Sequence, residues 1–232
     1  MKKLMGAAML AGATIAGVGA ANAEVSGSVT LVSDYVFRGI SQSDGGPAIQ
    51  GSFDWSQDMV YAGVWGSSTS LGGGESMELD AYVGITPTTG PVSWDLSLVG
   101  YFYPNADDDG ADFDYFEGIV GGTFNVSEQV TLGGKVAYTP EYFGQLGDGI
   151  YYEVNGGFAL NDATSFSAGY GVQDIDFAPD SYSTWNVGVS HAMHGFTLGL
   201  TYSDTSDAFE NGYSIDESSS DGRLVLSIGR EL

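Results

Sequence analysis

The chain has 232 residues, of which 30 are Asp or Glu and only six are Lys or Arg, and its formal net charge at pH 7 is −24. Such an acidic chain repels the phosphates of nucleic acids and attracts cations, so nucleic-acid binding is excluded. It contains no cysteine, which excludes disulfides and thiolate metal sites.

The first 23 residues have the parts of a secretory signal peptide. Lys2 and Lys3 precede an apolar run rich in Gly and Ala, and Ala21-Asn22-Ala23 supplies a small-residue cleavage pattern. We therefore predict a signal peptide over 1–23 and a single exported domain over 24–232.

After residue 23, apolar and polar residues alternate with a period of two, which is typical of strands with one apolar and one polar face. This alternation predicts twelve strands, although residues 60–65 are apolar on both faces and leave their register open. The predicted strands lie at about 28–38, 48–55, 60–67, 77–85, 92–102, 116–124, 130–139, 151–160, 164–173, 182–192, 196–203 and 222–232.

The connections between these segments are alternately short and long, and the long ones are polar and acidic. Short turns at one end and long loops at the other are typical of up-and-down barrels of the bacterial outer membrane. A secreted β-sandwich also has alternating strands. In this sequence aromatic residues gather near the ends of the predicted strands. The two interfaces of a membrane favour aromatic residues at these positions, whereas a β-sandwich core does not. We predict an all-β fold, a transmembrane antiparallel β-barrel of about 12 strands.

The stretch SDYVFRGISQSDGG, residues 33–46, contains the predicted end of the first strand. Continued alternation would direct Tyr35 and Phe37 toward lipid, and Asp34 and Arg38 into the barrel. From Gly39 onward we expect the chain to leave the membrane as the first external loop.

Three segments carry a family resemblance: SDYVFRGISQSDGGPAIQGSFDW, then YAGVWGSS, then ELDAYVGI. With them the chain resembles the TorF family of porins, most specifically in its N-terminal third. The resemblance implies a barrel in the outer membrane of a Gram-negative bacterium, and it implies no catalytic residues and no particular substrate.

The polar parity of the strands predicts which charged side chains face the lumen. Seven acids against three bases would favour cations over anions in an open pore. A barrel of 12 strands lies between packed and open sizes, so a lumen filled by buried pairs is the alternative. The candidate pore-lining residues are Asp34, Arg38, Asp54, Glu78, Asp80, Asp95, Glu117, Lys135, Glu153 and Arg223.

One long loop resembles the start of a calcium loop, with candidate oxygen ligands at Asn105, Asp107, Asp109 and Asp112. Phe113 and Phe116 stand where two further ligands would be expected, so a solvated acidic loop is the alternative. We predict no cofactor beyond weak Ca²⁺ or Mg²⁺ binding at these loops, where divalent cations would be shared with lipopolysaccharide.

The predicted function is a porin-like channel for passive diffusion of small cationic or polar solutes, with outer-membrane lipid and lipopolysaccharide as partners. One alternative is a non-conducting barrel that interacts through its acidic loops. Another is a lipid-modifying enzyme that uses His191. The second is disfavoured because Ser190 would point to the opposite face and no G-x-S-x-G motif is present.

Overall fold

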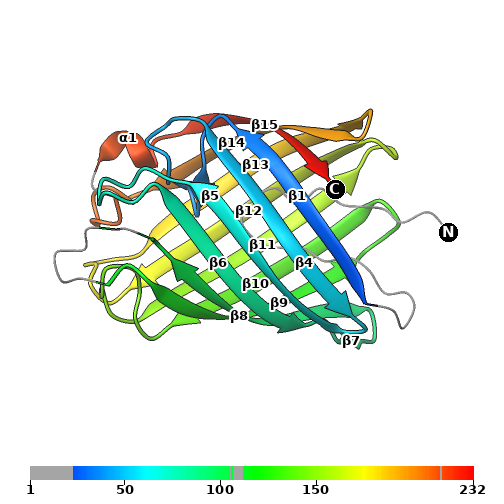
Figure 1. The fold of residues 1–232 in the computed structure, drawn as a ribbon, viewed down its shortest axis with the longest axis horizontal. Coiled ribbons are helices and arrows are strands. Elements are labelled where there is room, and N and C mark those ends of the chain that lie inside the picture. Colours follow the sequence, from blue (N-terminus) through cyan, green and yellow to red (C-terminus); the bar gives the residue numbers. More distant parts are fainter. Residues whose placement is uncertain (1–22, 105, 107–111, 215) are drawn as a thin grey trace.

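The computed structural model describes residues 23–104, 106, 112–214 and 216–232, and in these ranges the regular secondary structure is almost entirely β-strand (Figure 1). The short elements are β2 (Val36–Phe37), β3 (Ile40–Ser41), β7 (Thr88–Thr89) and α1 (Glu217–Ser220). The twelve long strands are β1 (Glu24–Val32), β4 (Ala48–Gln57), β5 (Val60–Ser68), β6 (Met77–Ile85), β8 (Val92–Phe102), β9 (Tyr115–Asn125), β10 (Val130–Thr139), β11 (Gly149–Ala159), β12 (Thr164–Ile175), β13 (Tyr182–Met193), β14 (Phe196–Ser206) and β15 (Arg223–Glu231). No helix in the described ranges is long and apolar enough to cross a membrane.

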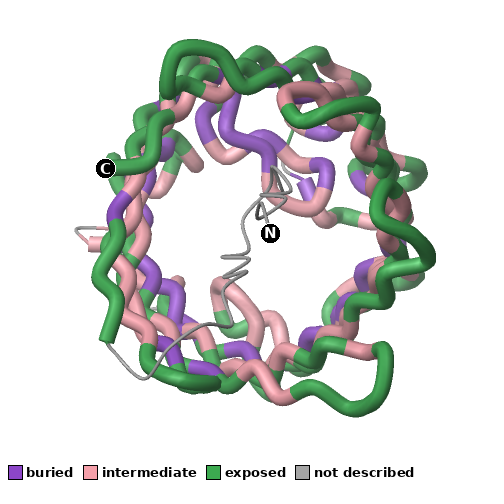
Figure 2. Tube along the Cα trace, turned by 90° about the vertical axis from the view of Figure 1, so that its right-hand side faces the viewer, coloured by how far each residue is buried: buried purple, intermediate pink, exposed green. Residues whose placement is uncertain are grey.

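The long strands form one closed antiparallel ring. Each pairs with its neighbours along the chain, and β1 closes the ring by pairing with β15 as well as with β4. Val29, for example, lies opposite both Arg230 and Gly51. The view along the axis in Figure 2 shows the ring directly. This confirms the predicted 12-strand barrel.

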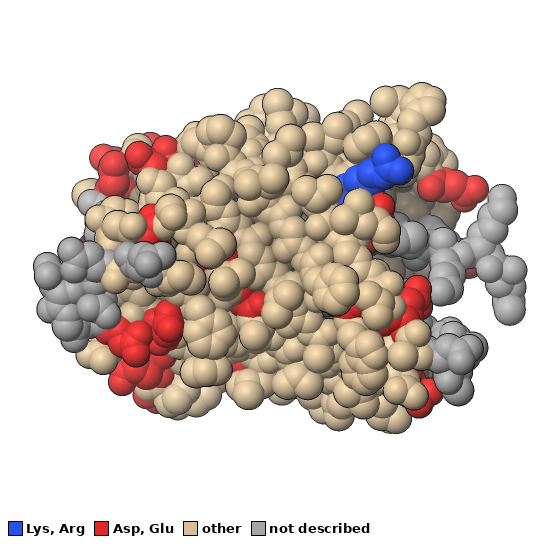
Figure 3. Space-filling model, in the orientation of Figure 1, with Lys and Arg blue, Asp and Glu red and all other residues tan. Residues whose placement is uncertain are grey.

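Most apolar side chains of the strands face outward, and most polar ones face the lumen. Leu31, Phe53 and Val154 are more than half exposed, whereas the inward-facing Glu78 and Glu117 are almost completely buried. Between its two ends, most of the face seen in Figure 3 carries no charge. A continuous exposed apolar belt is unfavourable in water but is required of a barrel in lipid.

The structure also settles the register of β5, which its sequence leaves open. Val60 and Val64 are exposed on the outer surface, while Tyr61 is buried on the lumen side. Its hydroxyl donates a 2.6 Å hydrogen bond to the lumen carboxylate of Asp95.

Connection lengths alternate around the ring as predicted. One end of the barrel carries short turns, at 58–59, 86–91, 126–129, 160–163 and 194–195. The other end carries long connections, at 33–47, 69–76, 103–114, 140–148, 176–181 and 207–222. The long-loop end is on the left in Figure 1, where α1 lies, and in outer-membrane barrels this end faces the outside.

The first strand differs from its prediction, because β1 ends at Val32 rather than near Phe37. The N–H of Ser33 still donates to the carbonyl of Leu226 (2.8 Å), but the N–H of Leu226 donates to the Ser33 hydroxyl (2.9 Å). A side chain thus takes the place of a backbone acceptor and the β1–β15 ladder stops. Residues 33–47, which we call the inner hairpin, then turn into the barrel, where Figure 2 shows buried chain inside the ring.

The inner hairpin contains a short antiparallel pair of its own. Strands β2 and β3 pair through Val36 with Ser41 and Phe37 with Ile40, joined by the two residues Arg38 and Gly39. Both have positive φ, 48° and 86°, as a two-residue hairpin turn requires. The expectation that the chain leaves the membrane at Gly39 is therefore wrong.

The predicted lipid-facing positions of Tyr35 and Phe37 are wrong for the same reason. Tyr35 is only 3% exposed and lies inside the ring, and Phe37 packs edge-on against Tyr101 of the lumen (6.0 Å between ring centroids). Period-two alternation fixes the direction of a side chain only as long as the strand continues.

Candidate functional site

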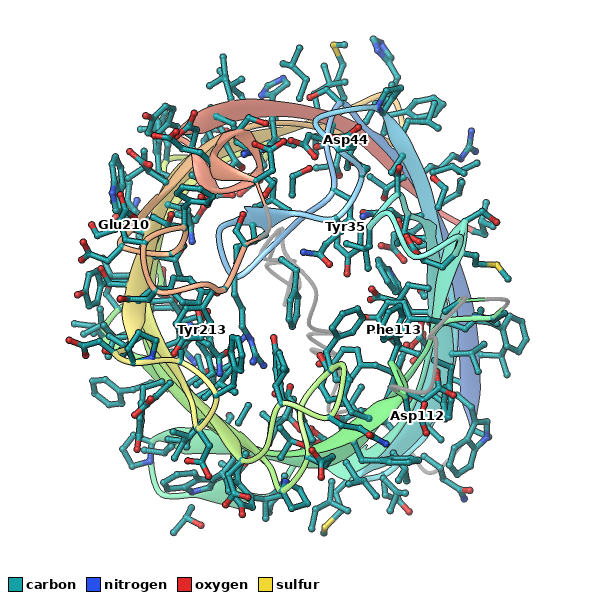
Figure 4. All side chains as sticks on the ribbon, turned by 90° about the vertical axis from the view of Figure 1, so that its left-hand side faces the viewer. Tyr35, Asp44, Asp112, Phe113, Glu210 and Tyr213 are labelled. Carbon is teal, nitrogen blue, oxygen red and sulfur yellow. The ribbon has the colours of Figure 1, made fainter. Side chains whose placement is uncertain are left out.

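The lumen is narrowed at the long-loop end by a layer of aromatic side chains. Tyr101, Tyr103 and Tyr115 form its buried centre, and Phe37 and Phe113 pack against them. Tyr101 and Tyr115, from neighbouring strands, stack with 4.5 Å between ring centroids. In Figure 4 the inner hairpin, which carries Tyr35, enters the ring near Phe113 and Tyr213. The aromatic layer lies where external loops and barrel wall meet.

Arg38, at the tip of the inner hairpin, joins the hairpin to two strands of the wall. Its guanidinium donates 2.6 Å hydrogen bonds to the carboxylate of Glu117 on β9 and to the side-chain carbonyl of Gln173 on β12. The Arg38 and Glu117 side chains are 6% and 1% exposed. Tyr101 donates a further hydrogen bond to Glu117 (3.1 Å), so the carboxylate has donors from both the hairpin and the wall.

Aromatic rings cover the remaining faces of this guanidinium. Its central carbon lies 4.7 Å from the centroid of Phe37 and 4.4 Å from that of Tyr151, distances at which cation–π attraction applies. Burial alone would lower the pKa of Arg38, but the neighbouring Glu117 carboxylate raises it well above its usual range. Burial also raises the pKa of Tyr142 to about 12, although the positive charge of Arg38 opposes that shift. Arg38 is therefore a charged side chain that anchors the hairpin tip to the wall.

The Arg38–Gly39 turn is itself enclosed by β13 and β14. The hydroxyl of Tyr182 donates to the carbonyl of Arg38 (2.9 Å). A Cβ added to Gly39 would lie 2.4 Å from side-chain atoms of Thr184 and Thr205, so only glycine fits both the positive φ and the close approach.

A second ion pair fixes the base of the inner hairpin. The Arg223 guanidinium donates to Asp34 (2.7 Å) and also to the carbonyls of Ser218 and Asp221, close to α1. Asp34 further accepts hydrogen bonds from Ser41 and Ser43. The first and last long connections are thus joined through one buried carboxylate.

Two acids on β6 complete the charged groups at this level. The hydroxyl of Tyr35 donates a 2.8 Å hydrogen bond to Glu78, and Asp80 lies two residues further along the same inward face. The six candidate residues at the long-loop end form what we call the outer tier. They are Asp34, Arg38, Glu78, Asp80, Glu117 and Arg223.

The other four candidates lie deeper, toward the short-turn end, and form the inner tier. Asp54 accepts hydrogen bonds from Tyr82 and Ser52. Asp95 accepts from Tyr61. The ammonium of Lys135 lies 3.5 Å from the Glu153 carboxylate, and these two side chains are 28% and 20% exposed.

All ten predicted residues therefore lie on the lumen side, and five of the six in the outer tier either belong to the inner hairpin or bind it. Sequence reasoning missed Gln173, Tyr151 and Tyr182, which surround Arg38, because they are ordinary inward-facing residues of distant strands. The Arg-Gly pair between two short β-prone dipeptides is the signal that could have revealed the hairpin turn.

The predicted divalent-cation site falls mostly outside the described residues, since Asn105, Asp107 and Asp109 are not among them. Asp112 is described, and its carboxylate accepts the N–H of Asp114 (3.0 Å). Within the described ranges no group of three His, Asp or Glu side chains could hold a metal ion.

His191, the residue of the enzyme alternative, lies exposed on β13 and its Nδ1 is 2.9 Å from the hydroxyl of Thr164. Ser190 points to the other face, where its hydroxyl bonds that of Ser165 (2.8 Å). The neighbouring serine and histidine thus do not form a nucleophile–base pair.

The fold is similar to solved structures of outer-membrane channels at low sequence identity. The structure titled KdgM porin has a TM-score of 0.59 and 6% identity, over 90% of this chain and 98% of that chain. An outer-membrane channel from Pseudomonas putida F1 has a TM-score of 0.50 and 10% identity, over 96% of this chain and 100% of that chain. With its apolar belt, this fold places the protein in the outer membrane of a Gram-negative bacterium.

No curated protein matches the chain. A family model does match, over residues 16–230, and its description is "Bacterial protein of unknown function" (Gcw_chp). The chain belongs to this family of bacterial proteins.

Proposed function

We propose that the protein is a channel for passive diffusion of small cationic or polar solutes across the outer membrane, and that the inner hairpin sets its aperture. One observation carries the proposal: the polar lumen is narrowed by a loop-borne hairpin held by side-chain contacts, not by strands of the wall. A barrier of this kind leaves the wall intact when it moves. The similarity to porin folds supports the proposal.

The charge of the lumen supports a preference for cations. Each tier has two more acids than bases, and rings of carboxylates favour cations in water-filled pores. One KdgM structure was solved with oligogalacturonate, a polyanion, and an acidic lumen would repel such a solute. We therefore propose amines, alkali ions and uncharged polar metabolites as solutes.

A closed barrel is the second candidate, because the packing of the inner hairpin favours it. Tyr35, Glu117 and Gln173 are at most 3% exposed, which leaves little space for water around the hairpin tip. In that case the protein would act through its external loops, with lipopolysaccharide and divalent cations as proposed partners there. Assignment to the TorF porins, like the signal peptide, is an expectation from the sequence.

Single-channel recording in a planar bilayer separates the two candidates. The matched variant replaces residues 35–45 by a short Gly/Ser loop, and heat-modifiable migration in SDS gels verifies that both barrels fold. We expect discrete conductance steps for the native protein, larger steps for the variant, and a cation-selective reversal potential in a KCl gradient. Conductance of the variant alone would establish the closed barrel, and silence of both folded proteins would reject the channel.

A further inference from the structure

Positive charge is distributed unequally in the outer tier. Arg38 is paired with Glu117, and Arg223 with Asp34. On β6, on the same inward face, Glu78 and Asp80 have no basic partner among the described residues. This side of the constriction therefore has two carboxylates and no cation to balance them.

The two carboxylates differ in what already binds them. Glu78 accepts the hydroxyl of Tyr35 (2.8 Å) and is 2% exposed. Asp80 is 9% exposed, and its buried Oδ1 has no hydrogen-bond partner within the described part of the chain. A buried carboxylate oxygen without a donor is costly, and a ligand that supplies an N–H would remove that cost.

Aromatic side chains border Asp80 on both neighbouring strands. Asp80 lies opposite Trp65 in the β5–β6 register and opposite Tyr101 in the β6–β8 register. Directly opposite side chains have Cβ atoms about 4.5–5.5 Å apart. Trp65 in turn contacts Tyr35 edge-on, with 5.4 Å between ring centroids. Indole and phenol faces attract cations, most strongly where water is excluded.

Tyr103 also lies beside these two acids. The pKa of Tyr103, which follows the end of β8, is raised well above its usual range by burial and then by Glu78 and Asp80. Tyr103 therefore lies close to both acids and adds a third ring to the site.

The chemistry of the site selects among cations. A metal ion would need several oxygen ligands, whereas in the described ranges no three acidic or His side chains converge on one point. A quaternary ammonium fits aromatic faces but has no N–H for the unpaired Oδ1. We propose that Asp80, with Glu78 and the rings of Trp65, Tyr101 and Tyr103, binds the protonated head group of a primary amine. As the identity of a permeating solute class, this inference rests on the proposed channel function.

Tryptophan fluorescence of the refolded protein in detergent micelles tests the site without requiring conductance. Methylammonium chloride, tetramethylammonium chloride and KCl are titrated at constant ionic strength. We expect a saturable response to methylammonium at about tenfold lower concentration than to the other two salts, because only methylammonium donates a charge-assisted hydrogen bond. This series needs no variant, so it stands even if a substitution disturbs folding.

Variants then locate the site. Asp80→Asn should weaken methylammonium binding about tenfold or more, since an amide cannot form the charge-assisted hydrogen bond that a carboxylate forms with an ammonium group. Asp95→Asn is the matched control, because Asp95 faces the same lumen but already accepts from Tyr61, and it should leave binding unchanged. Trp65→Phe should remove most of the fluorescence response, since the other tryptophans lie elsewhere on the barrel.

The outcomes separate this inference from the channel. Binding by a folded, non-conducting barrel would keep the amine site and reject the channel, and conductance without saturable binding would do the reverse. Equal responses to all three salts, or equal losses in the Asp80 and Asp95 variants, would show general attraction of cations to an acidic lumen and would overturn the amine site.

Discussion

The two charged tiers of the lumen contain the same kinds of residues in opposite surroundings. The Arg38–Glu117 pair of the outer tier is 2.6 Å long, with side chains 6% and 1% exposed. The Lys135–Glu153 pair of the inner tier is 3.5 Å long, with side chains 28% and 20% exposed. One pair is part of a packed contact between a hairpin and the wall, and the other lines a wetter part of the barrel.

This difference decides what each pair can do. Breaking a buried ion pair leaves an uncompensated charge and is strongly destabilising, whereas an exposed pair contributes little to stability. The outer tier should therefore govern whether the inner hairpin stays in place. The inner tier should govern which ions pass, with almost no effect on the fold.

The largest expected effect follows from Glu117→Ala. It leaves the Arg38 guanidinium buried with only the Gln173 amide as hydrogen-bond acceptor, at a cost of about 3–5 kcal/mol. Because the hairpin can leave the lumen while the barrel stays closed, we expect hairpin release rather than unfolding. Trypsin should then cleave after Arg38 at least about 100-fold faster than in the native protein.

Mass spectrometry of the tryptic fragments from protein in vesicles measures that rate. Glu117→Gln should give an intermediate rate, since its amide oxygen still accepts from Arg38 without a charge. Glu128→Ala, in an exposed short turn, is the control and should leave cleavage unchanged. Protection of Arg38 in the Glu117→Ala protein would show that the ion pair does not hold the hairpin.

A smaller effect is expected from Gly39→Ala, matched with Gly45→Ala in the same hairpin. Both residues have positive φ, 86° and 66°, so both substitutions cost about 1–2 kcal/mol of backbone strain. Only at Gly39 would the new methyl group also overlap Thr184 and Thr205, while nothing lies within 4 Å at Gly45.

Cleavage after Arg38 should therefore increase more in Gly39→Ala than in Gly45→Ala, and conductance should increase in the same order. Equal rates for the two variants would mean that the threonines move aside freely. The close approach at Gly39 would then not help to hold the hairpin.

The wall of the barrel could be predicted from the sequence because strands and turns are determined by patterns of residues that are close together in the chain. Alternation and turn composition place eleven of the twelve strands within a few residues of their observed bounds, and they place the lumen charges on the correct face. Both patterns depend on near neighbours in the chain.

The constriction could not be predicted in the same way, because its contacts join residues far apart in the sequence. Arg38 meets Gln173, 135 residues away, and Arg223 meets Asp34, 189 residues away. The pattern of residues 33–37 also continues the alternation of β1, so nothing within these five residues shows that the ladder ends at Ser33. The Ser33 hydroxyl takes the place of a backbone acceptor only because Leu226 of β15 lies beside it, and Leu226 is far away in the sequence.

The smallest effect on stability is expected in the inner tier. Lys135→Met keeps the length of the side chain and removes its charge, and since the pair with Glu153 is partly exposed, the free energy of unfolding should change by less than about 1 kcal/mol. Its effect on conduction should be clear, because Lys135 is the only base of the inner tier and its loss leaves Asp54, Asp95 and Glu153 unopposed. The reversal potential in a KCl gradient should shift toward stronger cation preference, while Lys135→Arg should leave it unchanged. Protection of Arg38 from trypsin should stay as in the native protein, since Lys135 forms its ion pair with Glu153 and shares only the ring of Tyr151 with Arg38. A shift of the reversal potential toward anion preference, or release of the hairpin, would contradict the separate roles of the two tiers.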